Sequence, residues 1–286
     1  MTGAGRGIGQ ASAPLLAQRG AAVVVNDLGG AVDGSGTDSG PADEVARQIA
    51  AAGGSALGDA HDVATSSGAQ ALVDGARNRF GRIDILINNA GIIRWAGFPE
   101  ADEDNLARHL AVHTIGSFNT ARAAWPHMCE AGYGRILMTT SSGVFGLPNN
   151  TSYATAKAAV IGLTRSLAVA GASHDIKANL IAPAAMTRMA GSSGPSDMAP
   201  ELVAPMAAYL AHEDCPVSGE IYSAGAGRFA RVFIAETPGY VHPGAEVRIE
   251  DVAEHWQAIN DETGYSVPAD LVSWSAAFLS HLPNQT

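Results

Sequence analysis

The segment Thr2–Gly9, with the sequence TGAGRGIG, decides which fold is expected for this chain. Its glycines follow the spacing Gly-x-x-x-Gly-x-Gly; the commoner Gly-x-Gly-x-x-Gly register fails because Ile8 and Gln10 occupy the required positions. Glycine lacks a Cβ atom and tolerates positive φ, so backbone N–H groups in such a loop can approach a phosphate group where a helix begins. We interpret the segment as an anion-binding loop, with a flexible Gly-rich terminus as the alternative.

Downstream of this loop, short apolar runs rich in β-branched residues alternate with Ala-rich stretches of helical spacing. Such runs are typical of strands that are buried on both faces of a parallel sheet. The alternation predicts an α/β fold, a Rossmann-like doubly wound parallel sheet flanked by helices with right-handed crossovers. We expect strands at 22–25, 83–87, 135–138 and 176–181, and helices at 8–19, 41–52, 66–80, 103–130 and 152–171.

The start of the sheet and the C-terminal region depart from this regular pattern. A phosphate loop normally leaves the end of a central strand, but only Met1 precedes the loop, so we expect the first strand to be missing or truncated. A gap there would leave backbone groups of the neighbouring strands unpaired. Residues 1–227 are predicted to form the dinucleotide-binding domain, and residues 228–286 a C-terminal extension packed on the same domain.

The composition limits the partners and the location of the protein. Of the 286 residues, 47% are hydrophobic, and the formal net charge of -11 at pH 7 argues against nucleic acid or an anionic membrane as the main partner. A small, mostly apolar substrate fits better. Cys129 and Cys215 are far apart, which argues against a disulfide framework or a thiolate zinc site. Without a long apolar run, a signal peptide or a peroxisomal Ser-Lys-Leu terminus, we expect a cytoplasmic protein.

Asp27 is a candidate determinant of cofactor choice. It follows the first Val-rich run and lies about 20 residues beyond the phosphate loop, as expected for a carboxylate that accepts hydrogen bonds from an adenine ribose. A 2′-phosphate would be repelled by this charge, and no Arg or Lys follows immediately to neutralise it. The position predicts NAD as the cofactor, with a solvated turn aspartate as the alternative.

Tyr153 and Lys157 form a candidate acid/base pair. They lie four residues apart at the start of a long helical stretch, so both side chains project from one helix face. An ammonium and an oxidised nicotinamide nearby would lower the pKa of the phenol from its usual value of about 10 toward neutrality. The alternative is an ordinary pair on a helix surface.

Together with Asn88–Gly91 at a strand end, these features resemble the short-chain dehydrogenase/reductase family over about Thr2 to Gly225. The resemblance implies an NAD-dependent oxidoreductase that interconverts a secondary alcohol and a ketone. It assigns Tyr153 as proton donor or acceptor, and Lys157 to the nicotinamide ribose and to the tyrosine pKa.

The family also places a hydroxyl at a strand end to orient the substrate oxygen. Counting forward along the strand from Gly134 gives Ser141, whereas counting back from the tyrosine gives Thr140. We prefer Ser141, because a buried strand holds its register while the following loop can lose a residue. Ser142 is then a bystander.

The resemblance further implies a set of cofactor contacts along the strand ends. They are expected from Gly3, Arg6, Gly7, Ile8 and Gly9, from Asp27, Asp62 and Val63, from Asn89, Ala90 and Gly91, from Tyr153 and Lys157, and from Pro183, Ala184, Met186 and Thr187.

Two positions depart from the pattern of the family. Pro183–Ala184 stands where Pro-Gly is common, so the backbone there is expected to be less free. His113 stands where most members place an asparagine that holds a proton-relay water; an imidazole can also hold water, and a packed helix residue is the alternative. His109 lies four residues before it, but no third ligand is evident, so we expect no metal site.

Within the family, several stretches are similar to the dehydrogenase units of type 2 peroxisomal multifunctional enzymes; these are Val25–Gly30, Ala123–Trp125, Thr187–Met189 and Gly225–Gly227. That similarity implies a 3-hydroxyacyl-CoA or a hydroxysteroid as substrate, although the acidic balance argues mildly against CoA. A homodimer or homotetramer is implied through the helices at 103–130 and 152–171. A non-catalytic nucleotide-binding or scaffold protein of the same fold is the alternative, prompted by the missing strand.

Overall fold

The computed structural model describes residues 1–191 and 196–282, without the side chain of residue 196. The chain divides into two compact units, Met1–Arg231 and Val232–Thr286. The first unit contains the sheet and its flanking helices, and each unit is described by itself. Whether residues 228–286 pack on the first unit stays a prediction.

The sheet has the predicted parallel arrangement. Its strands pair in the orders β1-β2 and β3-β4-β5-β6-β7, and all the pairs from β3 to β6, like β1 with β2, are parallel. The strands are β1 (Val23–Asn26), β2 (Ala56–Asp59), β3 (Ile85–Asn88), β4 (Gly134–Thr139), β5 (Ile176–Pro183), β6 (Ile221–Gly225) and β7 (Arg228–Val232). The carboxyl ends of β1, β3, β4 and β5 therefore meet at one edge, where the predicted site residues follow them.

Met1 and Thr2 connect the two groups of strands. Thr2 forms parallel bridges to Asn26 of β1 and to Asn88 of β3. Its N–H donates to the Ile87 carbonyl at 2.9 Å, and the Asn26 N–H donates to the Met1 carbonyl at 3.0 Å. Two residues thus bridge the sheet at the place where the sequence led us to expect a missing or truncated strand.

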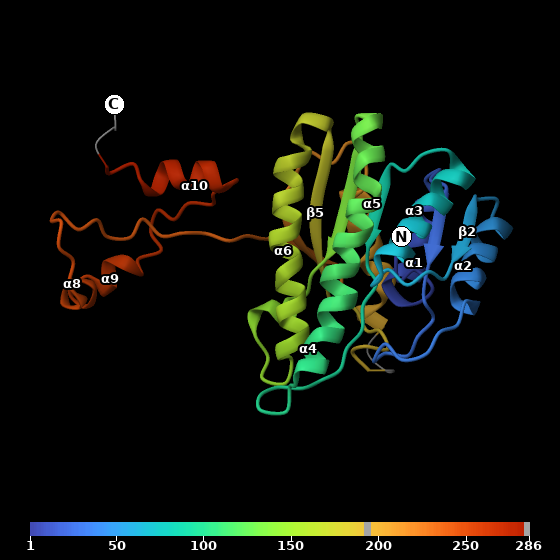
Figure 1. The fold of residues 1–286 in the computed structure, drawn as a ribbon, viewed down its shortest axis with the longest axis horizontal. Helices are drawn as coiled ribbons and strands as arrows, with labels where there is room; N and C mark the ends of the chain where they lie inside the picture. The colour runs from blue at the N-terminus through green and yellow to red at the C-terminus, as the bar shows by residue number, and fades with distance from the viewer. Residues whose placement is uncertain (192–195, 283–286) are drawn as a thin grey trace. The chain divides into compact units, whose positions relative to one another are not determined.

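The helices lie in two layers, as the sequence predicts. Figure 1 shows α3, α5 and α6 along one face of the sheet, and α1 packs with α2 and α7 on the other. The helices of this unit are α1 (Gly7–Gln18), α2 (Gly40–Ala51), α3 (Ser66–Phe80), α4 (Glu103–His109), α5 (Gly116–Ala131), α6 (Thr151–Gly171) and α7 (Ala204–Leu210), with short 3-10 turns at Ser142–Phe145, Ala172–His174, Ser196–Met198 and Pro200–Leu202. No described helix is both long and apolar enough to span a bilayer.

The single helix predicted at 103–130 is wrong in one respect. Between α4 and α5 the residues Leu110–Ile115 form a π-helix, in which each N–H reaches one residue further back than in an α-helix. The apolar spacing of the sequence continues through this turn, so periodicity alone gives no signal for it.

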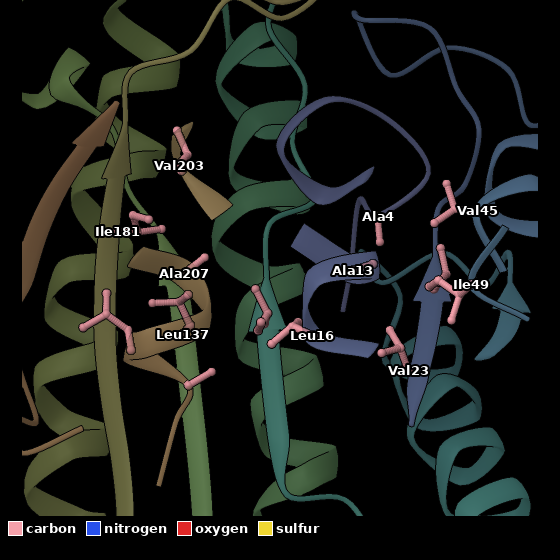
Figure 2. Close-up of a cluster of buried hydrophobic side chains, with 14 of the residues drawn as sticks. Ala4, Ala13, Leu16, Val23, Val45, Ile49, Leu137, Ile181, Val203 and Ala207 are labelled. Atoms are coloured by element: carbon pink, nitrogen blue, oxygen red, sulfur yellow. The ribbon is translucent and has the colours of Figure 1, made fainter. Parts of the chain in front are cut away.

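The main core lies between the sheet and the layer of α1, α2 and α7. Figure 2 shows Leu16 of α1, Val23 of β1, Ile49 of α2, Leu137 of β4 and Ala207 of α7 within this cluster, and all five are buried. The small residues of α1 allow this helix to approach the sheet closely. The core therefore fixes the helix whose first turn follows the phosphate loop.

The described residues of the second unit form short elements only. Its helices are α8 (Ile249–Glu254), α9 (Trp256–Ile259) and α10 (Leu271–Phe278). Helices α8 and α9 are separated by His255 alone. An antiparallel bridge joins Glu236 to Ser266.

Candidate active site

The phosphate loop forms an open backbone cradle at the start of α1. Gly3 and Gly7 adopt φ values of +59° and +55°, and a Cβ atom on Gly3 would lie only 2.7 Å from the Cα atom of Ala90. The side chain of Arg6, the N-cap residue, caps no N–H of the helix. The first-turn N–H groups can therefore bind an anion, so the loop fits the pyrophosphate of a dinucleotide.

Asp27 links this loop to the turn that follows β1. One carboxylate oxygen accepts the N–H of Gly5 at 2.9 Å, and the other accepts the N–H of Gly29 at 2.8 Å. The side chain is buried, which disfavours the alternative of a solvated turn aspartate. Because each carboxylate oxygen has a second lone pair, the group can still accept a hydrogen bond from a ribose hydroxyl.

Two arginines, Arg6 and Arg188, lie near Asp27, and the sequence analysis did not select Arg188 as a site residue. Arg6 and Arg188 each donate to the Gly30 carbonyl at 3.0 Å. Burial lowers the pKa of Arg188, the charge of Arg6 lowers it further, and Asp27 opposes the shift. Arg188 and Gly30 are 158 residues apart in the sequence, so only the three-dimensional structure shows that they are in contact.

A cleft of about 430 Å³ runs along the carboxyl edge of the strands. Many of the predicted cofactor residues line it: Gly3, Arg6, Gly7, Ile8, Asp27, Asp62, Val63, Asn89, Ala90, Gly91 and Thr187. His61, Arg188 and Met189 line it as well, although the sequence analysis did not select them.

The remaining predicted cofactor residues lie outside this lining: Gly9, Tyr153, Lys157, Pro183, Ala184 and Met186. Gly9 has a packing role, because a Cβ atom there would collide with the backbone of the loop at Gly3 and Ala4.

Ala184 donates its N–H to the Ala224 carbonyl at 2.8 Å, and its φ is not left-handed. Alanine therefore replaces glycine there without backbone strain.

Lys157 is buried behind the catalytic tyrosine candidate. Its Nζ donates to the Thr139 carbonyl at 2.7 Å and lies 5.8 Å from the centre of the Tyr153 ring. Burial lowers the pKa of Lys157 from 10.5 to about 7. In the described part of the chain the ammonium has one acceptor, at the end of β4, so further N–H groups remain for a ligand.

Tyr153 differs from the expectation drawn from the sequence. Its pKa is raised by burial, and the hydrogen bond with Ser141 lowers it only in part. The predicted shift toward neutrality is therefore absent in the protein without cofactor, since desolvation of the phenolate outweighs the favourable contacts. An additional positive charge or hydrogen-bond donor near the phenol would lower this pKa.

Thr140 and Ser141 lie in different surroundings. The Thr140 hydroxyl is buried and donates to the Lys157 carbonyl at 2.8 Å. The Ser141 hydroxyl accepts the N–H of Gly143 at 3.0 Å, and its position near the phenol lowers the pKa of Tyr153. Ser142 begins the 3-10 turn that follows. The geometry thus favours Ser141 as the hydroxyl that faces a substrate.

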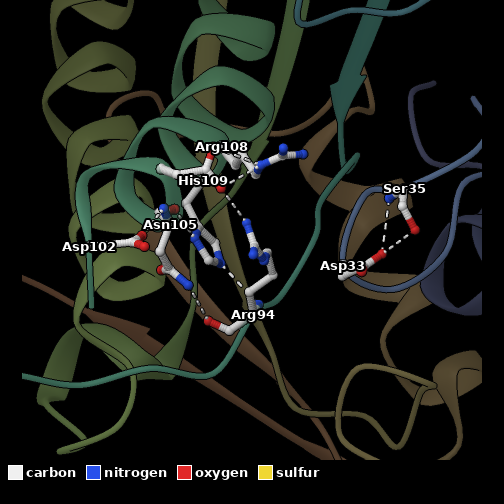
Figure 3. Close-up of polar contacts among 8 residues, drawn as sticks. Asp33, Ser35, Arg94, Asp102, Asn105, Arg108 and His109 are labelled. Atoms are coloured by element: carbon white, nitrogen blue, oxygen red, sulfur yellow. Dashed lines mark hydrogen bonds and ion pairs between the residues drawn. The ribbon is translucent and has the colours of Figure 1, made fainter. Parts of the chain in front are cut away.

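His109 and His113 stack with ring centres 5.9 Å apart, and the Tyr153 ring meets both edge-on. Both ring nitrogens of His109 are used, Nδ1 by the Asn105 carbonyl at 2.7 Å and Nε2 by the Arg94 N–H at 3.2 Å (Figure 3). His109 therefore positions the loop at Arg94 and has no nitrogen left for a metal.

His113 keeps one nitrogen unpaired within the described part of the chain. Its Nε2 lies 2.9 Å from the Ile92 carbonyl and 3.3 Å from the Ile92 N–H, and the shorter contact favours the tautomer with a proton on Nε2. Nδ1 is then a buried acceptor with no hydrogen-bond partner among the described residues. Burial, aided by the charge of Lys157, holds the pKa of His113 well below its usual value, so the ring is neutral.

A comparison with protein families matches residues 1–197 to the model described as short chain dehydrogenase. The chain is a member of the short-chain dehydrogenase family. This dehydrogenase is 40% identical over 272 residues to a short-chain type dehydrogenase/reductase of Mycobacterium tuberculosis, covering 93% of this chain and 95% of that protein. The predicted family and the predicted parallel sheet are confirmed.

Two further relatives of the dehydrogenase bear on its chemistry. It is 39% identical over 275 residues to peroxisomal multifunctional enzyme type 2 of Mus musculus, covering 94% of this chain and 37% of that much longer protein. The structure of a 7α-hydroxysteroid dehydrogenase complexed with NADH and 7-oxo glycochenodeoxycholic acid matches with a TM-score of 0.71 at 30% identity, covering 79% of this chain and 91% of that one.

Proposed function

We propose that this short-chain dehydrogenase uses NAD to interconvert a secondary alcohol and a ketone on a hydrophobic substrate, a 3-hydroxyacyl-CoA or a hydroxysteroid. The observation that carries the proposal is the placement of Tyr153 between the buried Lys157, whose Nζ lies 5.8 Å from the centre of the tyrosine ring, and the turn that Ser141 caps. A relative in the same family binds NADH and an oxidised steroid, which supports both the cofactor and the substrate class.

The side chains of this chain divide the work of proton transfer and orientation. Ser141 donates a hydrogen bond to the substrate oxygen, and the Tyr153 hydroxyl gives or takes the proton of that oxygen. Lys157 stabilises the phenolate by its charge and holds the nicotinamide ribose by its remaining N–H groups. NAD, when bound, accepts or supplies the hydride.

We assign His113 the task of holding a water molecule next to Lys157. The unpaired Nδ1 acceptor supports this role, since a buried acceptor without a partner is costly unless water or a ligand satisfies it. His113→Asn should keep most of the turnover, whereas His113→Leu should lower kcat about 10- to 100-fold with unchanged NADH affinity. Equal loss in both variants would assign His113 to packing alone.

Tyr153→Phe tests the proposed chemistry. We expect about a 10²- to 10⁴-fold loss of kcat, because the ring and its packing remain while the transferable proton is removed. Turnover and NADH binding by fluorescence titration are the two measurements. Tyr133→Phe, which precedes β4 at the opposite edge of the sheet, is the matched control. NADH binding without turnover in the unaltered chain would favour the scaffold alternative.

The preference for NAD over NADP rests on Asp27. Asp27→Asn should lower the ratio of NAD to NADP efficiency, because an amide keeps one acceptor but removes the charge that repels a 2′-phosphate. Arg6 and Arg188 at the Gly30 carbonyl bring positive charge to the same place. An unchanged ratio would show that these arginines, and not Asp27, decide the preference.

We further propose that the protein forms a homodimer or homotetramer with an interface made by α5 and α6. Three half-exposed apolar side chains support an interface there: Ile115, the last residue of the π-helix before α5, Phe118 on α5 and Val169 on α6. Phe118→Glu should shift the mass measured by light scattering toward the monomer. An unchanged mass would move the interface elsewhere.

A further inference from the structure

Arg188 connects the loop that follows β5 to the loop that follows β1. Its guanidinium donates to the Gly30 carbonyl at 3.0 Å. Both residues line the cleft of about 430 Å³ at the carboxyl edge of the strands, which the phosphate loop lines as well. The contact therefore joins two loops that border the same cleft, and the proposed chemistry gives Arg188 no role.

A second arginine, Arg6 in the phosphate loop, shares the same acceptor. It donates to the Gly30 carbonyl at 3.0 Å and to the Gly29 carbonyl at 3.4 Å. A carbonyl oxygen has two lone pairs, so the two guanidinium groups occupy both of those on Gly30. Two like charges are thereby held at one point, which is unfavourable unless a negative charge lies near them.

Asp27 compensates only one of these two charges. Its carboxylate is buried, and its two oxygens accept backbone N–H groups of the phosphate loop and of the turn after β1. Its charge opposes the lowering of the Arg188 pKa, but burial and the charge of Arg6 together outweigh it. This end of the cleft therefore carries an excess of positive charge, in a protein whose formal net charge is -11.

Most of the N–H groups of the two arginines have no acceptor within the described part of the chain. A guanidinium carries five N–H groups, of which Arg188 uses one and Arg6 uses two. The others are available to a ligand in the cleft. Guanidinium groups bind phosphate oxygens through parallel hydrogen bonds, so the pair of arginines fits a phosphate group better than a neutral one.

The backbone around Arg188 is fixed against the phosphate loop. A Cβ atom on Gly7, the first residue of α1, would lie 3.3 Å from the methyl group of Thr187. The Thr187 hydroxyl accepts the N–H of Met189 at 3.3 Å, and both residues line the cleft. Arg188 therefore extends from a segment that packs on the loop whose N–H groups fit a pyrophosphate.

We propose that Arg188 is a cofactor-binding residue that holds the pyrophosphate of the dinucleotide together with Arg6, and so ties the loop after β5 to the bound cofactor; this inference rests on the proposed function. The pyrophosphate, which ADP and NAD share, supplies the negative charge that the two arginines lack. The 2′-phosphate of NADP is another source of the same chemistry, and the experiment distinguishes the two.

Isothermal titration calorimetry of the full chain with ADP, NADH and NADPH tests this assignment. Arg188→Gln removes the charge but keeps an N–H donor for Gly30, whereas Arg188→Lys keeps the charge. Because the side chain is exposed, we expect Arg188→Gln to weaken ADP and NADH binding by about 10-fold, the lower end for hydrogen bonds to charged groups. Arg188→Lys should weaken them less than about threefold. Arg77→Gln, at an exposed position on α3, is the matched control and should change neither.

The outcomes separate this inference from the proposed function. Unchanged ADP and NADH affinity in Arg188→Gln overturns the inference, as do equal losses in the Gln and Lys variants, which would show that Arg188 only joins the two loops. A loss for NADPH alone would place the charge at the 2′-phosphate and overturn it too. ADP binding needs no turnover, so Arg188-dependent ADP affinity in a protein that oxidises no alcohol would refute the proposed function and keep this inference.

Discussion

The two units of the chain differ in how they bury apolar side chains. In Met1–Arg231, the strands and the inner helix faces surround a continuous core, and residues such as Leu137 and Val25 are completely buried. Among the described residues of Val232–Thr286, none is buried. More than half of the exposed large apolar side chains of the described chain belong to this shorter unit.

The difference shows that a segment can form capped helices without forming a buried apolar core. The second unit has capped helices and stacked rings, for example Tyr240 on His255 with ring centres 3.7 Å apart. Short helices gain most of their stability from tertiary packing and little from intrinsic propensity. The apolar side chains of the second unit therefore need another surface, and the prediction that residues 228–286 pack on the catalytic domain would supply one.

The largest expected difference concerns a matched pair of leucines. Leu137→Ala should lower the free energy of unfolding by about 2–5 kcal/mol, because it opens a cavity in the core. Leu271→Ala, at a position that is 74% exposed, should change it by less than about 0.5 kcal/mol. Chemical denaturation followed by circular dichroism measures both. A large loss at Leu271 would mean that α10 is covered in the assembled protein.

A smaller effect concerns the pH dependence of stability. The pKa of Lys157 is about 7 in the folded protein, against an ordinary value of 10.5. Between pH 7 and pH 10.5 the unfolded chain therefore binds more protons than the folded protein. The free energy of unfolding rises with pH over this range. The slope reaches at most about 1.4 kcal/mol per pH unit. Neutral His113 and Tyr153 face the ammonium and do not titrate near pH 8.

Lys157→Met should remove this slope, as measured by denaturation at pH 8, 8.5 and 9, above the range in which the buried Met1 ammonium contributes. The stability of the second unit should depend on pH at the acid end only. Arg248 lowers the pKa of Asp251, so the stabilisation from this ion pair is lost as the pH falls through that lowered pKa. A slope that survives in Lys157→Met would show that another buried group carries it.

The smallest expected difference concerns helix caps. Thr65 accepts the N–H of Gly68 at the start of α3, and Asp270 accepts the N–H of Ser273 at the start of α10. Replacing either cap by alanine should cost its helix about 1 kcal/mol. Thr65→Ala should shift the unfolding transition of the whole first unit, whereas Asp270→Ala should increase amide exchange in α10 alone. Equal behaviour would contradict the lack of a core among residues 232–282.

Much of the fold could be predicted because its signals are local. Glycine spacing, apolar runs and helical periodicity identified β1, β3, β4 and β5 with the helices around them. Strand β2 was missed because Gly58 interrupts a short and only partly buried run. The later elements α7, β6 and β7 are brief, and their patterns resemble those of loops.

The candidate site was less accessible to sequence reasoning. Tyr153 and Lys157 share one helix, so their spacing was sufficient to bring them together. The contact of Arg188 with Gly30 and the edge-on contact of the Tyr153 ring with the two histidines depend on segments that meet only in three dimensions. The pKa of Tyr153 could not be predicted either, because it depends on how much water burial excludes.

The π-helix at Leu110–Ile115 has a consequence for how the sequence can change. A π-turn is equivalent to one residue inserted into an α-helix, and each residue turns an α-helix by about 100°. Deleting a single codon within this turn would make α4 and α5 continuous but rotate one against the other by that angle. Either His113 would leave Tyr153, or α5 would turn its buried face away from the sheet. The length of this short turn is therefore under a tighter constraint than the identity of most of its residues.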